Sequence, residues 1–84
     1  ILNNNYPNPF NPSTKISFNL PKSDMVTLSI YNMLGQHVAT LINERLDAGY
    51  HEFNFDASSL SNGVYFYKLV SGDFTGVNKM MLIK

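Results

Sequence analysis

The chain contains neither cysteine nor tryptophan. Without cysteine it can form no disulfide framework and no zinc–thiolate site. This absence does not identify the redox compartment, because a domain with enough apolar core can be secreted without disulfides. The absence of tryptophan counts against a sugar-binding surface, in which flat aromatic side chains stack on sugar rings.

Charge is scarce as well. Only 14% of the residues are charged, against about a quarter in an ordinary globular protein, and six basic residues balance six acidic ones. No basic stripe attracts nucleic acid or anionic lipid, so no nucleic-acid partner is expected. No apolar run approaches the ~18 residues of a membrane-spanning helix. The sequence begins with Ile1 and has no signal peptide, so we expect that it was cut from a longer protein, downstream of another domain.

What the chain does contain is a series of short alternating segments. Of its 84 residues, 44% are hydrophobic, which suffices for one folded domain. Apolar and polar residues alternate as in half-buried strands, and turn-forming residues separate the runs. The predicted strands cover residues 14–20, 25–32, 36–43, 50–56, 64–70 and 77–84. This pattern predicts an all-β fold, an immunoglobulin-like antiparallel β-sandwich of six to seven strands.

The alternation also assigns the core. In the third predicted strand, Val38 is the best core candidate, with either Leu41 or Ile42 beside it. In the first, second and fifth strands, the side chains expected to face inward are Ile16, Phe18, Leu20, Val26, Leu28, Ile30, Tyr65, Tyr67 and Leu69.

Two further expectations concern the fifth strand. A buried tyrosine hydroxyl requires a hydrogen-bond partner, so we expect one for Tyr65 or Tyr67. Gly63 follows Asn62 and opens the strand abruptly, which predicts a positive φ at the glycine.

The start of the chain has a different composition. Residues 1–13 are rich in proline and asparagine and predict a lead-in arm, whereas residues 14–84 predict the sandwich. We expect Tyr6, Phe10 or both to pack on the sandwich and fasten the arm. Three residues that fix their own φ and lack an N–H make the arm stiff and extended: Pro7, Pro9 and Pro12.

Nothing in the sequence predicts catalysis. His37 and His51 lie on different predicted strands, and a metal site would need them adjacent in space together with a third ligand. We expect one histidine on the surface and the other partly buried and hydrogen-bonded. No serine stands in a nucleophile elbow or beside a histidine. We therefore expect no enzyme, no metal and no cofactor. Four acidic residues are expected in turns, where aspartate bonds to the local backbone: Asp24, Asp47, Asp56 and Asp73.

Three aromatic residues, Tyr31, Tyr50 and Phe66, are expected on outer faces of the sandwich. A row of aromatic rings can bind sugars. It can also result from ordinary cross-strand pairing, which stabilises a sheet without any ligand. We favour the pairing.

Five blocks of sequence stand in a recognisable order. They are YPNPFNPST with KISFNL, VTLSIYNMLGQHVATL, AGYHEFNFD, LSNGVYFYKL and KMMLIK. From Tyr6 to Lys84 the chain therefore resembles the type A C-terminal sorting domain of proteins that the type IX (Por) secretion system of Bacteroidota exports. Ser61 and Asn62 depart from the family pattern, which often has proline or alanine there.

The resemblance implies a secretion signal. The domain would direct an N-terminal cargo domain of the same chain across the outer membrane, from the periplasm to the cell surface or the medium. The implied partners are the type IX translocon and a sortase-like peptidase. The alternative is an accessory β-sandwich of a secreted enzyme, either carbohydrate-binding or a spacer. Edge strands would also allow a weak homodimer.

The resemblance also implies which residues matter. The last strand would carry the signal, through Lys79, Met80, Met81, Leu82, Ile83 and Lys84. Both of its faces are apolar, so either Met81 and Ile83 or Met80 and Leu82 face outward. The family motif assigns structural positions to Pro7, Pro9, Pro12, Gly35, Gly49, Gly63 and Tyr65.

Overall fold

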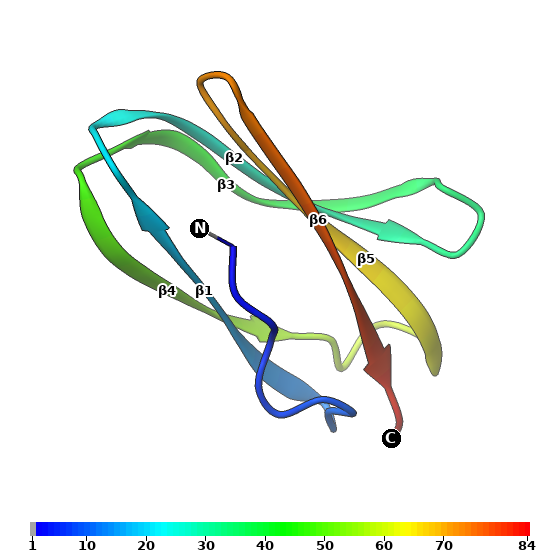
Figure 1. Cartoon of the computed structure of the whole chain (residues 1–84). Coiled ribbons are helices and arrows are strands. Elements are labelled where there is room, and N and C mark those ends of the chain that lie inside the picture. The colour runs from blue at the N-terminus through cyan, green and yellow to red at the C-terminus, as the bar shows by residue number, and fades with distance from the viewer. Residues whose placement is uncertain (1) are drawn as a thin grey trace.

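Six antiparallel strands form two packed sheets in the computed structural model, which describes residues 2–84 (Figure 1). The predicted all-β sandwich is confirmed. The smaller sheet pairs β1 (Ser13–Leu20) with β4 (Gly49–Asp56). The larger sheet has the strand order β3-β2-β5-β6. Its members are β2 (Asp24–Asn32), β3 (His37–Leu46), β5 (Gly63–Ser71) and β6 (Phe74–Leu82).

The core lies between the two sheets. It is formed largely by the side chains that the alternation of apolar and polar residues predicted to face inward. All nine side chains predicted to face inward from β1, β2 and β5 are buried. In β3, Leu41 and Ile42 are both half-buried and pack on the core together with Val38. Five further buried side chains complete the core: Phe10, Phe55, Ala57, Met80 and Leu82.

Two strands extend beyond their predicted limits. Residues 44–46 were expected in a loop, but they pair with residues 24–26 and prolong β3. Residues 74–76 were expected in a hairpin connection, but they pair with residues 69–71 and begin β6. The connection is only two residues long, since Gly72, with a φ of +57°, turns the chain tightly enough to keep the strands paired. At both places pairing with the neighbouring strand extends the strand beyond the limit that local composition predicted.

Two acidic residues were placed wrongly by turn composition. Asp24 begins β2 and Asp56 ends β4, so both belong to strands. They still make the local bonds expected of aspartate: Oδ1 of Asp24 accepts from the Met25 N–H at 2.8 Å, and Oδ1 of Asp56 accepts from the Ser58 N–H at 2.9 Å.

The arm is fastened to both sheets. Its backbone forms bridges with β1 at Leu2 and Tyr6 and with β6 at Phe10. The Phe10 ring is buried and lies 6.3 Å from the Phe55 ring, measured between centroids. The arm therefore runs along the side of the sandwich between β1 and β6 (Figure 1). The peptide bonds before Pro7, Pro9 and Pro12 are cis.

Polar side chains hold the arm in register. The Tyr67 hydroxyl donates to the Asn3 carbonyl at 2.7 Å, which confirms that an inward tyrosine has a partner. Asn78 Nδ2 donates to the same carbonyl at 3.1 Å. Asn5 is buried, and its Nδ2 donates to Thr14 Oγ1 at 3.0 Å. An amide makes such bonds without the desolvation cost that a buried charge would carry.

Replacing Gly63 with alanine should lower the free energy of unfolding by about 1–3 kcal/mol through backbone strain. Gly63 has a φ of +148°, which confirms the positive φ predicted for it. A Cβ there would meet no atom within 4 Å, so steric clash is not the cause. Urea unfolding measures the loss. The control, Ser59→Ala, changes an exposed loop residue and should stay within about 0.5 kcal/mol of the original chain. Equal effects would contradict the strain at Gly63.

Phe10→Ala should destabilise the domain by about 3–5 kcal/mol, because it empties a fully enclosed ring site. Tyr6→Ala truncates another aromatic residue of the same arm, but Tyr6 is 81% exposed, so its loss should change the unfolding free energy by less than about 0.5 kcal/mol. Thermal or urea unfolding separates the two variants. Similar stabilities would mean that the arm contributes nothing to the core.

Tyr67→Phe should destabilise the domain by about 0.5–1.5 kcal/mol at neutral pH. Burial raises the pKa of the Tyr67 hydroxyl above 10.0, although hydrogen bonds from Asn78 and the Asn5 backbone act in the opposite direction. The folded state thus favours the neutral phenol. This contribution is fully present below the unfolded pKa of 10.0 and is lost as the pH rises above it. The difference in unfolding free energy between the wild type and the variant should therefore narrow as the pH rises above about 10 and through the raised pKa of the folded state. A gap that widened would contradict this assignment.

Candidate recognition surface on the last strand

The two faces of the last segment, the end of β6 and Ile83 after it, differ sharply in exposure. Met80 and Leu82 are fully buried, whereas Met81 is 39% and Ile83 49% exposed. The pairing with β5 decides between the two alternatives, because Met80 lies opposite the core residue Tyr65. The outward apolar residues at the end of the chain are therefore Met81 and Ile83.

The arm occupies the free edge of β6 at the same level. The Phe10 N–H donates to the Met81 carbonyl at 3.0 Å, and the Ile83 N–H donates to the Phe10 carbonyl at 3.0 Å. The Met81 N–H donates to Asn8 Oδ1, also at 3.0 Å. These three bonds satisfy the backbone groups that an edge strand would otherwise offer to another chain.

A shallow groove lies between the arm and β6. It has a volume of about 210 Å³. Its lining combines both segments: Asn8, Pro9, Lys79, Met80 and Met81. The first and last blocks of the sequence therefore form one continuous surface.

The two lysines of the final segment have different surroundings. Lys79 is exposed on the outward face of β6. Lys84 is bound to the β4–β5 loop, since its N–H donates to Asn62 Oδ1 at 2.9 Å and its Nζ donates to the Ser58 carbonyl at 3.0 Å. Lys79 is thus the freer charge, whereas Lys84 fastens the chain end.

Several residues of the family motif gather around β6. Gly63 pairs with Leu82, and Tyr65 pairs with Met80. The Tyr65 hydroxyl donates to the Ser61 carbonyl at 2.7 Å and so fixes the loop that precedes β5. Both residues belong to β5, the strand that pairs with β6.

Other motif residues lie elsewhere. Gly35 stands in the β2–β3 turn with a φ of +81°, and Gly49 begins β4 with a φ of +123°. The Pro12 carbonyl accepts from the Ala57 N–H at 2.9 Å, which ties the end of the arm to the segment after β4. The structure thus does not bring the whole motif to one site.

Sequence reasoning missed the asparagines that attach the chain end. Asn8 and Asn62 each accept a hydrogen bond from the final segment, and their partners lie 73 and 22 positions away. Local patterns predict only that such residues favour turns. The unusual number of asparagines in the arm was the available signal, but it does not name their partners.

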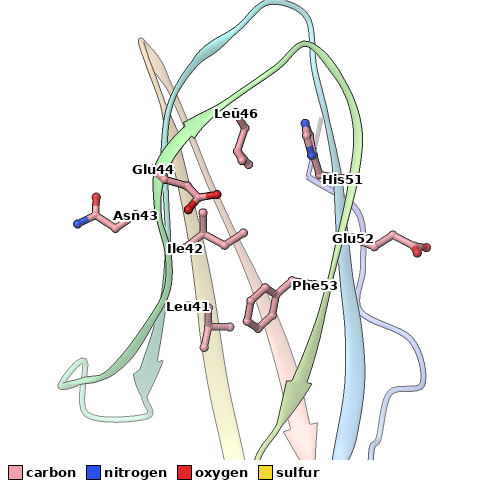
Figure 2. A pocket seen from close by; sticks show the side chains of 8 residues that line it. All are labelled: Leu41, Ile42, Asn43, Glu44, Leu46, His51, Glu52 and Phe53. Atoms are coloured by element: carbon pink, nitrogen blue, oxygen red, sulfur yellow. The ribbon is translucent and has the colours of Figure 1, made fainter.

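A second cavity lies between β3 and β4, on the side of the sandwich away from the arm. Its volume is about 290 Å³. Figure 2 shows Leu41, Ile42 and Phe53 pointing into it, whereas Asn43 and Glu52 point away. Apolar side chains from opposite sheets thus meet across an opening that no further strand closes in the described chain.

The histidines are bound to local partners. His37 Nε2 lies 2.8 Å from Thr40 Oγ1, and His51 Nε2 lies 2.7 Å from the Asp47 carbonyl. Across residues 2–84, no group of three or more histidine, aspartate or glutamate side chains is placed to hold a metal ion.

The outer aromatic side chains have partners within the sheets. Tyr31 pairs with His37 across β2 and β3, with ring centroids 5.6 Å apart in an edge-on contact. The Tyr50 hydroxyl donates to Glu52 at 2.9 Å. The contact of Tyr31 is a cross-strand pair, whereas Tyr50 bonds to a neighbour two residues along the same strand, β4.

Fold and surface together define a class: a small β-sandwich whose first segment is fastened beside its last strand. Residues 4–84 match the family model described as "Secretion system C-terminal sorting domain", and the chain belongs to this family. It is a sorting signal of the type IX secretion system, a non-enzymatic kind of domain. Such a domain marks its protein as cargo for export across the outer membrane, to the cell surface or the medium.

No curated protein matches the chain at a significant level. Within residues 2–84, no helix is long and apolar enough to cross a membrane.

Proposed function

We propose that the secretion machinery reads this domain through the outward side chains of its last segment, chiefly Lys79, Met81 and Ile83. The observation that carries the proposal is the exposure of Met81 and Ile83 beside two buried neighbours. The core accounts for Met80 and Leu82. It gives no reason for apolar side chains on the opposite face, and an apolar group that faces water at a chain end is well suited to a partner.

The outward face is a better contact than the backbone edge. At Met81 and Ile83 the edge groups already bond to the arm, so a partner strand would first have to displace Phe10. That displacement would expose a buried ring. A partner that covers the outward side chains and the groove beside Pro9 leaves the fold intact, and it meets both ends of the domain at once.

In this proposal, the protein that binds the last segment is a component of the type IX translocon. A sortase-like peptidase is the second partner. Neither role requires chemistry from the domain. Its histidines make local bonds, in keeping with a domain that is recognised and does not catalyse. Met81 and Ile83 would form the apolar centre of the interface, and Lys79 would lie at its rim. Such an arrangement, a desolvated centre surrounded by polar groups, is common in protein interfaces.

Deleting residues 79–84 is an ambiguous test of this proposal. The deletion removes Met80 and Leu82 from the core together with the outward residues. An unfolded domain and an unread domain would then both fail to be exported. Substitutions on the exposed face separate these outcomes.

The double variant Met81→Ser/Ile83→Ser should lower export of a reporter fused ahead of the domain by about ten-fold or more, because a few desolvated side chains carry most of the binding free energy of an interface. Export is measured as the share of reporter that reaches the surface or medium of a host with a type IX system. The control, Met25→Ser, changes a methionine that is 49% exposed on β2 and should leave export unchanged. Both purified variants should unfold cooperatively. Full export of a folded double variant would contradict the proposal.

A further inference from the structure

The turn between β2 and β3 exposes two large apolar side chains. Met33 is 72% and Leu34 83% exposed. Neither side chain belongs to the core, so the fold does not require apolar residues at these two positions. The hairpin that carries them projects at one end of the molecule (Figure 1). Exposed apolar residues at a projecting tip are a typical mark of a contact surface.

The turn is held rigidly by residues other than these two. Asn32 Oδ1 accepts from the Leu34 and Gln36 N–H groups, both at 3.0 Å. The Asn32 N–H donates to the Gln36 carbonyl at 2.9 Å, and the Gly35 N–H donates to the Asn32 carbonyl at 3.0 Å. Gly35 has a positive φ, which completes the tight turn. The turn therefore needs neither Met33 nor Leu34 for its shape, but it fixes the backbone that presents them, and such preorganisation favours binding.

The surroundings of the tip indicate the chemistry of its partner. No charged residue occurs between Tyr31 and Asn43, so the tip offers nothing to an acidic or basic surface, and it lacks the lysines that draw proteins to anionic lipid. A convex, uncharged and apolar tip fits an apolar concavity. Methionine adapts to such a pocket because its side chain is unbranched and flexible.

The tip is also connected to the proposed recognition surface. A hollow of about 240 Å³ is lined by Met33, Leu34 and Val64, among others. Val64 pairs with Met81 of β6. One partner that covers Met81 would therefore lie close to the tip as well.

We propose that Met33 and Leu34 form a second contact of the sorting signal and insert into an apolar cavity of a protein component of the type IX machinery. This inference rests on the sorting function and names a part of the reading site that is separate from β6. The machinery would then recognise a folded domain by two contacts, one at the β2–β3 turn and one on the last segment.

The test uses the reporter fusion in a host with a type IX system. The variant Met33→Ser/Leu34→Ser should reduce the exported share about ten-fold or more, as expected for two lost interface anchors. Met25→Ser is again the control. The purified tip variant should keep its melting temperature within about 2 °C, because the replaced side chains are exposed. Normal export of this variant would overturn the proposal.

Two further outcomes have distinct meanings. Flotation with vesicles of phosphatidylethanolamine and phosphatidylglycerol tests for lipid binding. If the purified domain floats with them and the tip variant does not, the tip binds lipid, and the proposal that it enters a cavity of a protein partner is wrong. We expect no flotation of either protein. If the wild-type fusion stays in the periplasm, the sorting function itself fails. If the wild-type fusion is exported and the tip variant is not, the result supports the tip contact. It also refutes a recognition mode in which the machinery contacts only β6.

Discussion

The smaller sheet has two strands and cannot by itself cover the inner face of a four-stranded sheet. The arm makes up the difference. It inserts Phe10 into the core and bonds to β1 on one side and to β6 on the other. In a domain of this size the buried surface is modest, so one enclosed ring is a large share of the stability. The first dozen residues and the last strand therefore depend on each other.

This dependence fixes which side chains of β6 enter the core and which face outward. Pairing with β5 fixes the register of β6, and the register assigns Met80 and Leu82 to the core. The arm then saturates the edge at Met81 and Ile83. What remains of the strand for a partner is a row of outward side chains. The proposed signal is thus displayed only when the domain has folded, because an unfolded chain has no inner and outer face.

The sequence was sufficient for the strands and for the composition of the core. Strict alternation in β1, β2 and β5 predicted their inward residues correctly. It was insufficient where both faces are apolar, as in β6, since the exposed face there is decided by pairing with Val64 and Tyr65. It was also insufficient at the end of β3 and at the start of β6, where residues expected in loops join the strands because a neighbouring strand pairs with them.

The arm shows a further limit of local reasoning. Proline cannot donate to a sheet, and this suggests a segment that separates the cargo from the strands. Phe10 stands between Pro9 and Asn11, however, and retains both its N–H and its carbonyl. Those two groups are the ones that bond to β6. The prolines limit how far pairing can extend, while the residue between them makes it possible. A proline-rich segment can therefore close a sandwich without adding a long strand, and here it leaves the outward side chains of the last strand exposed.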